Sequence, residues 1–461
     1  MDKGEREETM STLEFTETCR LESIYCTDPR NVPNPDVLII GSAIGLFAAT
    51  DLLAKDAHRI LVVDAGPFDL PTHLGNTAIP RLQFILDGGK RVSGKLALWG
   101  VSTPRPQMQE LKQWPYPMDS LLASFDAVEK QLAIADSIPY SDLIIERAVI
   151  ERLREVIPNA TVRRAPLAID RFGHRWSPLD RVAELVRKGL NLTSRFKCTA
   201  LHREGNAIVS VDGVWRDSKR VTLRPKIVVL AVGVEPSFEL IQPICARTLP
   251  IEPSDHIRVD AHGSLPRDAF GSAPIEDLGI AAVIVELRCK EHSIPYHLEV
   301  KVGPRALWPR YMPSGDNLEG SEDPETIYVQ IQAIAAMHAR FPTRDLLRVR
   351  SSIPPVMSAQ DAFFQGEIVQ TMFDVASALN LTPTFAFRPL LANHHVYGAY
   401  RVGSAVSSEF KLDGFQNLFV LPPSAYVDSD DDANPTLKSC VLSLRATDEI
   451  NRLMCRGVNP N

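Results

Sequence analysis

The sequence predicts an α/β protein in which a domain built on a parallel sheet is interleaved with an α+β domain built on an antiparallel sheet. Three observations lead to this fold class. Residues 36–64 read as a strand, a small-residue turn, a helix and a second strand. Residues 192–232 read as two strands joined by a short turn, followed by a fully apolar strand. From 246 to 388, strands of alternating polarity become frequent and glycine turns rarer, which favours an antiparallel sheet.

The composition is that of a globular protein with core enough for two domains. Of 461 residues, 44% are apolar and 23% charged, and the net charge of -7 argues against nucleic acid as the main partner. No apolar run approaches the ~20 residues of a membrane span, and the acidic start of the chain lacks the apolar segment of a secretory signal. The seven cysteines include no C-x-x-C pair, as in a protein with reduced thiols. We therefore expect a cytoplasmic protein with no membrane or nucleic-acid partner, and a flexible N-terminal extension over residues 1–35.

The first expected unit, DVLIIGSAIGLFAATDLLAK (36–55), has the order of a Rossmann-like dinucleotide-binding motif. The apolar run Val37 to Ile40 leads into Gly41, and the apolar residues that follow share one face of a helix. A second apolar run, 60–63, comes next. A strand that enters a helix through a glycine-rich turn presents free backbone N–H groups to a pyrophosphate.

The turn itself departs from the usual G-x-G-x-x-G spacing. Ala43 occupies the position of the second glycine of this pattern, and Gly45 comes one residue before the position of the third. Asp64, however, follows the second strand at about the 20-residue separation at which an acid binds the adenosine ribose. These features predict a dinucleotide site, and the alternative is a plain βαβ unit with a tight turn and a surface Asp64.

The remaining elements follow from periodicity and from turn residues. A helix is expected over 179–190, a strand over 227–232 that ends at Gly233, and alternating strands within 281–290, 295–302 and 326–335. A last helix should begin at Pro435, because Asn434 is a good N-cap and proline favours the first helical position.

Several further stretches carry a family resemblance when they are taken in order. After the turn and VVDAGP (62–67), they are VSGKLALWGVSTPRP (92–106), WPYPMDSLLASFDAVEKQLAIA (114–135), VVLAVGVEPSFELI (228–241), SDHIRVDAHGSLPRDAF (254–270), HHVYGAYRVG (394–403) and ANPTL (433–437). Together they resemble the glucose–methanol–choline (GMC) oxidoreductases, the flavoprotein family of glucose oxidase, choline oxidase and pyranose oxidase. The chain looks like a short, divergent member.

The resemblance implies an FAD-binding domain of the two-dinucleotide-binding type, made of residues 36–110, 165–245 and 395–455, and a substrate domain made of 111–164 and 246–394. It implies oxidation of a small-molecule alcohol or related C–H donor by hydride transfer to the flavin, with oxygen or another electron acceptor, as in a tailoring step of secondary metabolism. The FAD is expected to be non-covalent, because Leu98 stands where pyranose oxidase has the histidine that bonds to flavin.

Carried over position by position, the resemblance makes His395 the catalytic base and Asn434 its partner, with His394 and Tyr397 beside the substrate. A neutral imidazole can take the hydroxyl proton near neutral pH, and an amide can hold the oxygen. The helix from Pro435 would direct its positive end at the flavin, where it favours the charge on reduced flavin. The implied cofactor contacts are Gly41, Ser42, Ala43, Gly45, Asp64, Ala65, Gly66, Gly94, Lys95, Trp99, Gly100, Cys198, Ala231, Gly233, Ala433, Pro435 and Thr436.

The residues alone leave alternatives open at this end of the chain. Asn434 could instead be only a helix cap, and His394 with His395 could be a buried hydrogen-bonded pair or metal ligands. A metal is not expected, because no third ligand stands at suitable spacing. The acids of DSDDDAN (428–434) resemble half of a calcium loop but lack its later ligands, so we expect a solvated acidic loop.

Several departures from the family pattern support a second hypothesis. Pro422 replaces an acid that usually helps to bind FAD, Asp431 and Asp432 replace common glycines, and the first turn is short. A cyclase or isomerase that keeps the fold and uses His395 as an acid/base is therefore the alternative function. A purely binding or scaffolding role comes third.

Overall fold

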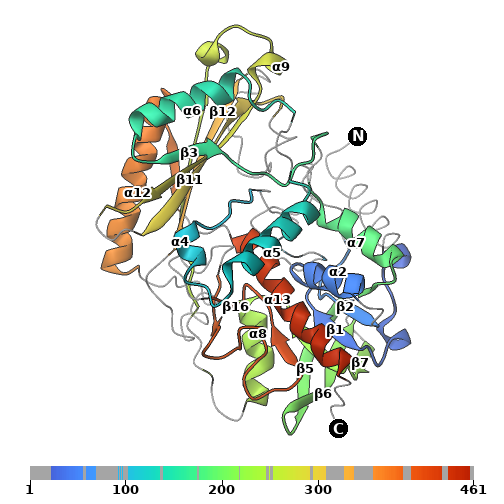
Figure 1. Ribbon diagram of the computed structural model, residues 1–461. Helices are drawn as coiled ribbons and strands as arrows, with labels where there is room; N and C mark the ends of the chain where they lie inside the picture. The colour runs from blue at the N-terminus through green and yellow to red at the C-terminus, as the bar shows by residue number, and fades with distance from the viewer. Residues whose placement is uncertain are drawn as a thin grey trace, which may run out of the picture.

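The protein is mixed α/β, as expected, and its described residues form a five-stranded parallel sheet, a two-stranded parallel pair and two antiparallel sheets (Figure 1). The computed structural model describes residues 22–55, 59–68, 92, 94, 96, 102–134, 139–173, 176–216, 219–245, 249, 253–290, 294–307, 326–336, 357–387, 396–427 and 435–456.

The parallel sheet has five strands in the order β15-β8-β1-β2-β4. They are β1 (Val37–Ile40), β2 (Ile60–Val63), β4 (Asn191–Thr193), β8 (Ile227–Leu230) and β15 (Leu418–Val420), every neighbouring pair parallel. The apolar runs predicted before and after the first helix are β1 and β2, and that helix is α2 (Gly45–Lys55). Parallel strands are buried on both faces, which is why these segments are continuously apolar.

Helices and a meander surround this sheet. They are α5 (Met118–Gln131), α7 (Pro178–Arg187), α8 (Val234–Ile241), α13 (Pro435–Cys455), the 3-10 helices η1 (Pro29–Asn31) and η4 (Gln242–Ile244), and the antiparallel strands β5 (Phe196–Glu204), β6 (Ala207–Trp215) and β7 (Lys219–Leu223). The last helix begins at Pro435, as predicted, and packs along α2 and α5.

The second sheet is antiparallel and has the order β13-β9-β12-β11-β10-β3. Its strands are β3 (Thr161–Arg164), β9 (His256–Leu265), β10 (Ala281–Arg288), β11 (Pro295–Pro304), β12 (Ile327–Ala336) and β13 (Thr384–Phe387). The predicted strands at 281–290, 295–302 and 326–335 are therefore confirmed as β10, β11 and β12. Around this sheet lie α6 (Ile144–Val156), α9 (Ile275–Leu278), α12 (Ala359–Ala378) and η5 (Arg267–Phe270). The short helix α4 (Met108–Leu111) places its Leu111 in the core of the parallel-sheet body.

The two faces of this six-stranded sheet have different neighbours. Val283 and Val285 of β10 belong to an apolar core with residues of α6 and α12, which define the outer face (Figure 1). Ala282 and Ile284, pointing the other way, belong instead to the core of the parallel sheet. This second face, here called the inner face, is thus turned toward the parallel-sheet body.

The segment 111–164, which the sequence assigns as a whole to the substrate domain, contributes to both bodies. Its first helix, α5, packs on α13 of the parallel-sheet body, and Arg445 of α13 donates to Ser120 of α5 at 2.8 Å. Its later elements, α6 and β3, belong to the six-stranded sheet and its outer face.

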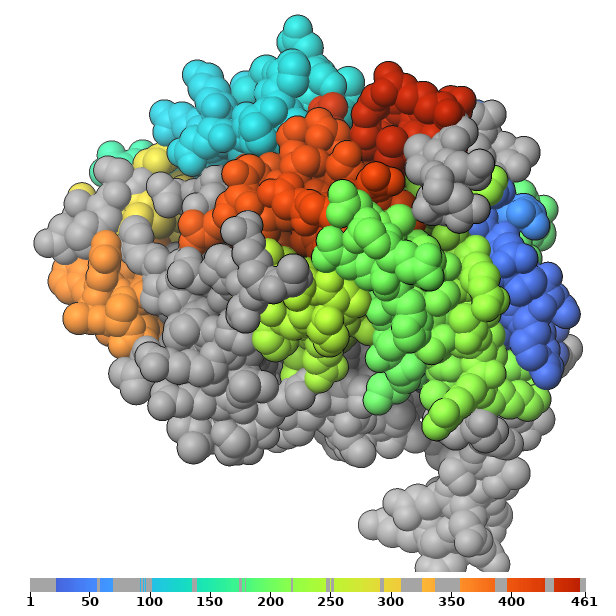
Figure 2. Space-filling model, turned by 90° about the horizontal axis from the view of Figure 1, so that it is seen from below, coloured from blue at the N-terminus to red at the C-terminus, as the bar shows by residue number. Residues whose placement is uncertain are grey.

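Residues 396–427 link the two sides of the parallel-sheet body. They hold the parallel pair β14 (Tyr400–Arg401) and β16 (Ala425–Tyr426). Tyr116 comes just before α5, and its hydroxyl donates to the Ser408 carbonyl at 2.7 Å. On the other side, the Gln416 amide donates to the Asn206 carbonyl of the meander at 2.8 Å. Figure 2 shows this orange-red segment between the cyan residues around α5 and the green meander. Within the described ranges, no helix is both long and apolar enough to cross a bilayer.

Candidate functional site

The turn after β1 is built so that only glycine fits at Gly41. Its φ is +98°, in the left-handed region, and a Cβ there would lie 2.4 Å from the carbonyl oxygen of Ala231. Ala231 follows β8, and its amide donates to the Ile40 carbonyl at 2.7 Å. The ends of β1 and β8 are therefore locked together, and two predicted cofactor residues, Gly41 and Ala231, are in contact.

Asp64 turns back onto this turn. Its Oδ2 accepts from the Ser42 amide at 3.0 Å and from the Ser42 hydroxyl at 2.5 Å, and its Oδ1 accepts from the Gly66 amide at 2.9 Å. Burial raises the pKa of Asp64, although these three hydrogen bonds act to lower it. The structure thus brings Ser42, Asp64 and Gly66 together, and the Asp64 carboxylate accepts three hydrogen bonds from within the protein.

The next three amides are arranged differently. Among the described residues, the N–H groups of Ala43, Ile44 and Gly45 have no hydrogen-bond acceptor. Ala43 and Ile44 directly precede α2 and Gly45 begins it. A helix leaves its first N–H groups unpaired and carries a partial positive charge at this end. A Cβ on Gly45 would meet the Ile39 side chain at 2.7 Å, so glycine also allows α2 to pack closely on β1. The turn therefore offers consecutive donors to an anionic group.

Cys198 and Gly233, two other predicted contacts, lie on elements that meet this region. The chain before Cys198 runs beside the Asp64 turn, because the Phe196 amide donates to the Asp64 carbonyl at 2.8 Å. Burial raises the pKa of the Cys198 thiol to about 12, so it is protonated at neutral pH. Gly233 has a φ of +83° and directly precedes α8.

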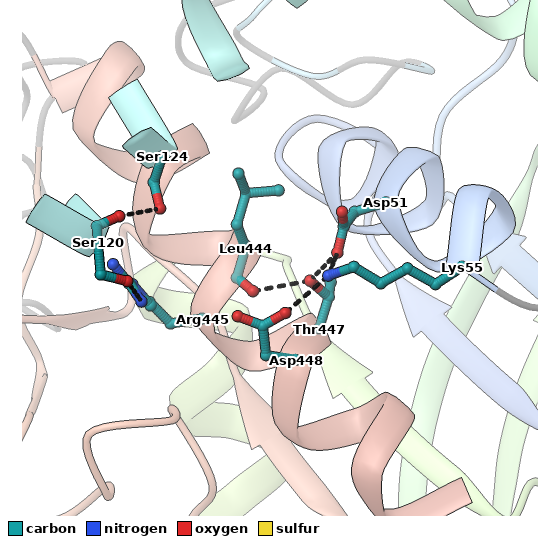
Figure 3. Close-up of polar contacts among 8 residues, drawn as sticks. All are labelled: Asp51, Lys55, Ser120, Ser124, Leu444, Arg445, Thr447 and Asp448. Atoms are coloured by element: carbon teal, nitrogen blue, oxygen red, sulfur yellow. Dashed lines mark hydrogen bonds and ion pairs between the residues drawn. The ribbon is translucent and has the colours of Figure 1, made fainter. Parts of the chain in front are cut away.

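A polar network holds α2 against α13 (Figure 3). Lys55 Nζ lies 2.6 Å from Asp51 Oδ2 in α2 and 2.7 Å from Asp448 Oδ1 in α13. The Thr447 hydroxyl, also in α13, donates to Asp51 as well. The network therefore joins the C-terminal half of α2, the helix that begins at the glycine turn, to the C-terminal half of α13, the helix that begins at Pro435.

The inner face of the six-stranded sheet is polar and buried, and sequence reasoning missed it. His256, Arg258 and Asp260 alternate along β9, His297, Glu299 and Lys301 along β11, and Gln330 and Gln332 along β12, each at most 8% exposed. Cross-strand pairing puts Glu299 beside Gln332 and Gln332 beside Asp260. The available signal was the alternation itself, which also fits a strand with one solvated face.

These buried charges lie in pairs. Arg258 Nε is 3.3 Å from Asp260 Oδ2, and the Gln332 amide donates to Asp260 Oδ1 at 2.6 Å. Burial would raise the pKa of Glu299, but the Lys301 charge, with His297 and Ser102, holds this pKa well below its usual value. Glu299 is therefore ionised at neutral pH.

Tyr397, predicted to lie beside the substrate, adjoins this face. Its ring stacks on the His256 ring with centroids 4.8 Å apart, and it forms a T-shaped pair with the Tyr426 ring, with centroids 5.2 Å apart. Tyr397 and Ser254 exchange backbone hydrogen bonds of 2.9 and 3.0 Å. The described end of the HHVYGAYRVG stretch therefore meets the inner face at the first residue of β9.

The other predicted site residues divide as follows. Ala65 is exposed after β2, Gly94 has a positive φ of 50°, and Pro435 and Thr436 begin α13. Outside the described residues lie Lys95, Trp99, Gly100, His394, His395, Ala433 and Asn434, with the rest of the acidic loop 428–434.

No protein-family model matches the chain, and no curated protein matches it.

Proposed function

We propose that this protein is an FAD-dependent oxidoreductase that removes a hydride from a small-molecule alcohol or a related C–H donor. The observation that carries the proposal is the glycine turn, where Gly41 is fixed against Ala231 and three consecutive amides at the start of α2 have no acceptor among the described residues. Such a turn, within a parallel sheet, suits a pyrophosphate. The ordered resemblance to GMC oxidoreductases supports FAD as the dinucleotide.

The residues present fit such a cofactor. The amides of Ala43, Ile44 and Gly45 would bind the pyrophosphate, and Asp64, which has some acceptor capacity left beyond its three hydrogen bonds, would bind the ribose. The start of α13 at Pro435 would supply positive helix potential to the flavin. When bound, FAD supplies the hydride acceptor.

The chain's own residues would bind the alcohol and move its proton. In this proposal His395 accepts the hydroxyl proton and Asn434 orients the oxygen, while Tyr397, stacked on His256, forms part of the substrate wall. The polar inner face would hold the remainder of the substrate.

The experiment is anaerobic mixing of the purified protein with a panel of alcohols while the flavin absorbance is followed. Loss of the oxidised-flavin band with one class of alcohol, and its return on admission of oxygen or another acceptor, is the expected result. The matched control is the same protein without alcohol. Flavin that no alcohol in the panel reduces would contradict the redox function.

One observation favours a second candidate, a non-redox cyclase or isomerase. The inner face carries buried acid–base side chains, Glu299 and His297 among them, that could move protons without any hydride transfer. Product formation from a substrate whose addition never bleaches the flavin would establish this alternative.

A further inference from the structure

Arg258, a buried arginine of the inner face, contacts its carboxylate partner through one nitrogen only. It lies on β9 between His256 and Asp260, and it points to the inner face because Ile257 and Val259 belong to the outer core. Arg258 is 7% exposed. Its Nε lies 3.3 Å from Asp260 Oδ2 and 3.4 Å from Oδ1. Among the described residues, Nη1 and Nη2 have no acceptor, so the four N–H donors of these two atoms are unused.

A completed pair elsewhere in the chain shows the difference. Arg105 donates to Glu129 from Nε at 2.6 Å and from Nη2 at 2.7 Å. This bidentate arrangement is the strong form of an arginine–carboxylate contact. Burying a charged pair is costly unless good geometry and further hydrogen bonds complete it. The contact between Arg258 and Asp260 therefore orients the guanidinium but leaves its hydrogen bonding incomplete.

The outer edge of the Arg258 guanidinium is not sealed by protein. Elsewhere, the Nε and Nη2 atoms of Arg445 are sealed from solvent and have no partner. In the described part of the chain Nη1 and Nη2 of Arg258 also lack a partner, but they are not sealed in this way. This edge therefore borders space in which the oxygen atoms of a ligand can lie.

The guanidinium is held in place from the neighbouring strand. The Gln332 side chain of β12 donates to Asp260 Oδ1 at 2.6 Å, and the two residues are cross-strand partners. Asp260 and Gln332 are both buried. A donor that is oriented before its ligand arrives loses less conformational freedom on binding, so this chain of side chains prepares Arg258 to bind an anion.

Arg258 also lies next to the expected substrate wall. His256, the preceding inner-face residue of β9, is about 7 Å away along the strand. The His256 ring stacks on the Tyr397 ring with centroids 4.8 Å apart. A ligand group bound by Arg258 would thus lie near a group bound beside Tyr397.

The charges on the inner face fit a singly charged ligand group. Lys301 and Glu299 of β11 form one ion pair, with Nζ 3.2 Å from Oε2, and Arg258 and Asp260 form another. These four charges sum to zero. The two oxygens of a carboxylate match the planar spacing of Nη1 and Nη2, whereas a doubly charged phosphate would need a further cation.

We propose that Arg258 binds a carboxylate of the substrate through Nη1 and Nη2, so that the alcohol oxidised by this protein is a hydroxy acid. Asp260 and Gln332 orient the guanidinium, and the alcohol end of the substrate lies on the Tyr397 side. The proposal rests on the proposed function and narrows its substrate class.

The test titrates carboxylates that carry no alcohol into the full-length protein by calorimetry. The probes are benzoate and the unbranched carboxylates from butanoate to octanoate, each beside its own primary amide, which keeps the shape and removes the charge. We expect at least one carboxylate to bind roughly 10–100-fold more tightly than its amide, because hydrogen bonds to a charged group are stronger than those to a neutral one. Equal affinity of every carboxylate and its amide, or no binding by any carboxylate, would overturn the proposal.

Variants then locate the anion. Arg258→Gln should abolish the preference for the carboxylate over the amide. Because this change leaves the buried Asp260 charge without its cation, Arg258→Gln/Asp260→Asn is measured as well, with the same loss expected. Arg163→Gln is the matched control and should keep the wild-type preference, because Arg163 lies on the edge strand β3 of the same sheet and also pairs with a carboxylate, Glu286 at 2.6 Å. A preference that survives in the double variant, or that Arg163→Gln loses equally, would overturn the assignment to Arg258.

A kinetic readout connects this binding to oxidation. The ω-hydroxy acid whose chain length matches the tightest carboxylate is compared with its amide in turnover. Arg258→Gln should raise KM for the hydroxy acid roughly 10–100-fold and change kcat by less than about threefold, because the carboxylate is bound alike in the ground and transition states. An unchanged KM, or oxidation of other alcohols but of no hydroxy acid, would overturn the substrate class. Failure of the proposed function would appear instead as a flavin that no alcohol reduces, and the calorimetric titrations would still decide whether Arg258 binds carboxylates.

Discussion

Replacing Asp64 should weaken the protein before any cofactor is added. In the structure the carboxylate accepts three hydrogen bonds from its own turn, two from the amides of Ser42 and Gly66 and one from the Ser42 hydroxyl. Asp64→Ala would leave both amides without this acceptor. A buried donor left unsatisfied costs ~1–3 kcal/mol, so we expect the variant to lose about 2–5 kcal/mol of stability in its FAD-free form.

The assay is calorimetric unfolding of the FAD-free protein, together with FAD titration of the same samples. Ser42→Ala is the matched control, because it removes one hydroxyl and keeps both amides, and we expect it to cost roughly 1 kcal/mol. Asp64→Ala should also bind FAD more weakly, because the turn is no longer held. An Asp64→Ala variant that is as stable as wild type without FAD but binds FAD poorly would refute this reasoning, and would show that Asp64 acts on the ribose alone.

The pH dependence of stability gives a second view of the same residue. Burial raises the folded-state pKa of Asp64 above its unfolded value, so ionisation of Asp64 opposes folding. The stability that protonated Asp64 contributes to the folded state is fully present below the unfolded pKa. It is lost as the pH rises through the folded pKa. Asp64→Asn should remove this loss from the stability–pH curve, and an unchanged curve would contradict the assignment.

Four further outcomes are expected. Gly41→Ala should abolish FAD binding and destabilise the fold, because its Cβ would meet the Ala231 carbonyl at 2.4 Å; binding measured as for wild type would contradict this. Since the folded-state pKa of Glu299 is lowered, ionised Glu299 contributes stability that is present above its unfolded pKa and lost as the pH falls through its folded pKa. Acid unfolding of Glu299→Gln should therefore show no loss of stability from this residue. Asp51→Asn should cost about 1 kcal/mol in unfolding experiments, because it weakens the Lys55 and Thr447 contacts; a stability equal to wild type would show the network to be solvated. His395→Ala should slow anaerobic flavin reduction roughly 10²–10⁴-fold in stopped-flow traces while FAD stays bound, and wild-type rates would place the base elsewhere.

Much of the parallel-sheet body could be predicted from the sequence, because strands buried on both faces are continuously apolar. The runs 37–40 and 60–63 are strands in the structure, and α13 begins at Pro435 as its start signals indicate. Glycine at 41 was predictable from spacing, whereas its reason, the Ala231 carbonyl, depends on how β8 lies beside β1.

The site was predicted less well, because its chemistry depends on tertiary packing. An alternation such as His256, Arg258, Asp260 has the same period in a solvated strand as in a buried one. In the described part of the chain, these side chains are buried, and their sheet packs on this side against the core of the parallel-sheet body, a placement that the alternation does not reveal. Likewise, the sequence places Asp64 near the turn, but the direction of so short a side chain, toward Ser42 rather than outward, is set by local geometry.

The central claim, that the Gly41 turn holds FAD, is tested most directly by the visible absorption spectrum of the purified full-length protein. The spectrum should be taken before and after addition of excess FAD and removal of unbound cofactor. We expect the oxidised-flavin bands in the wild-type protein, FAD released intact by acid or heat because it is non-covalent, and no retained flavin in Gly41→Ala. A colourless wild-type protein that retains no added FAD would contradict the claim.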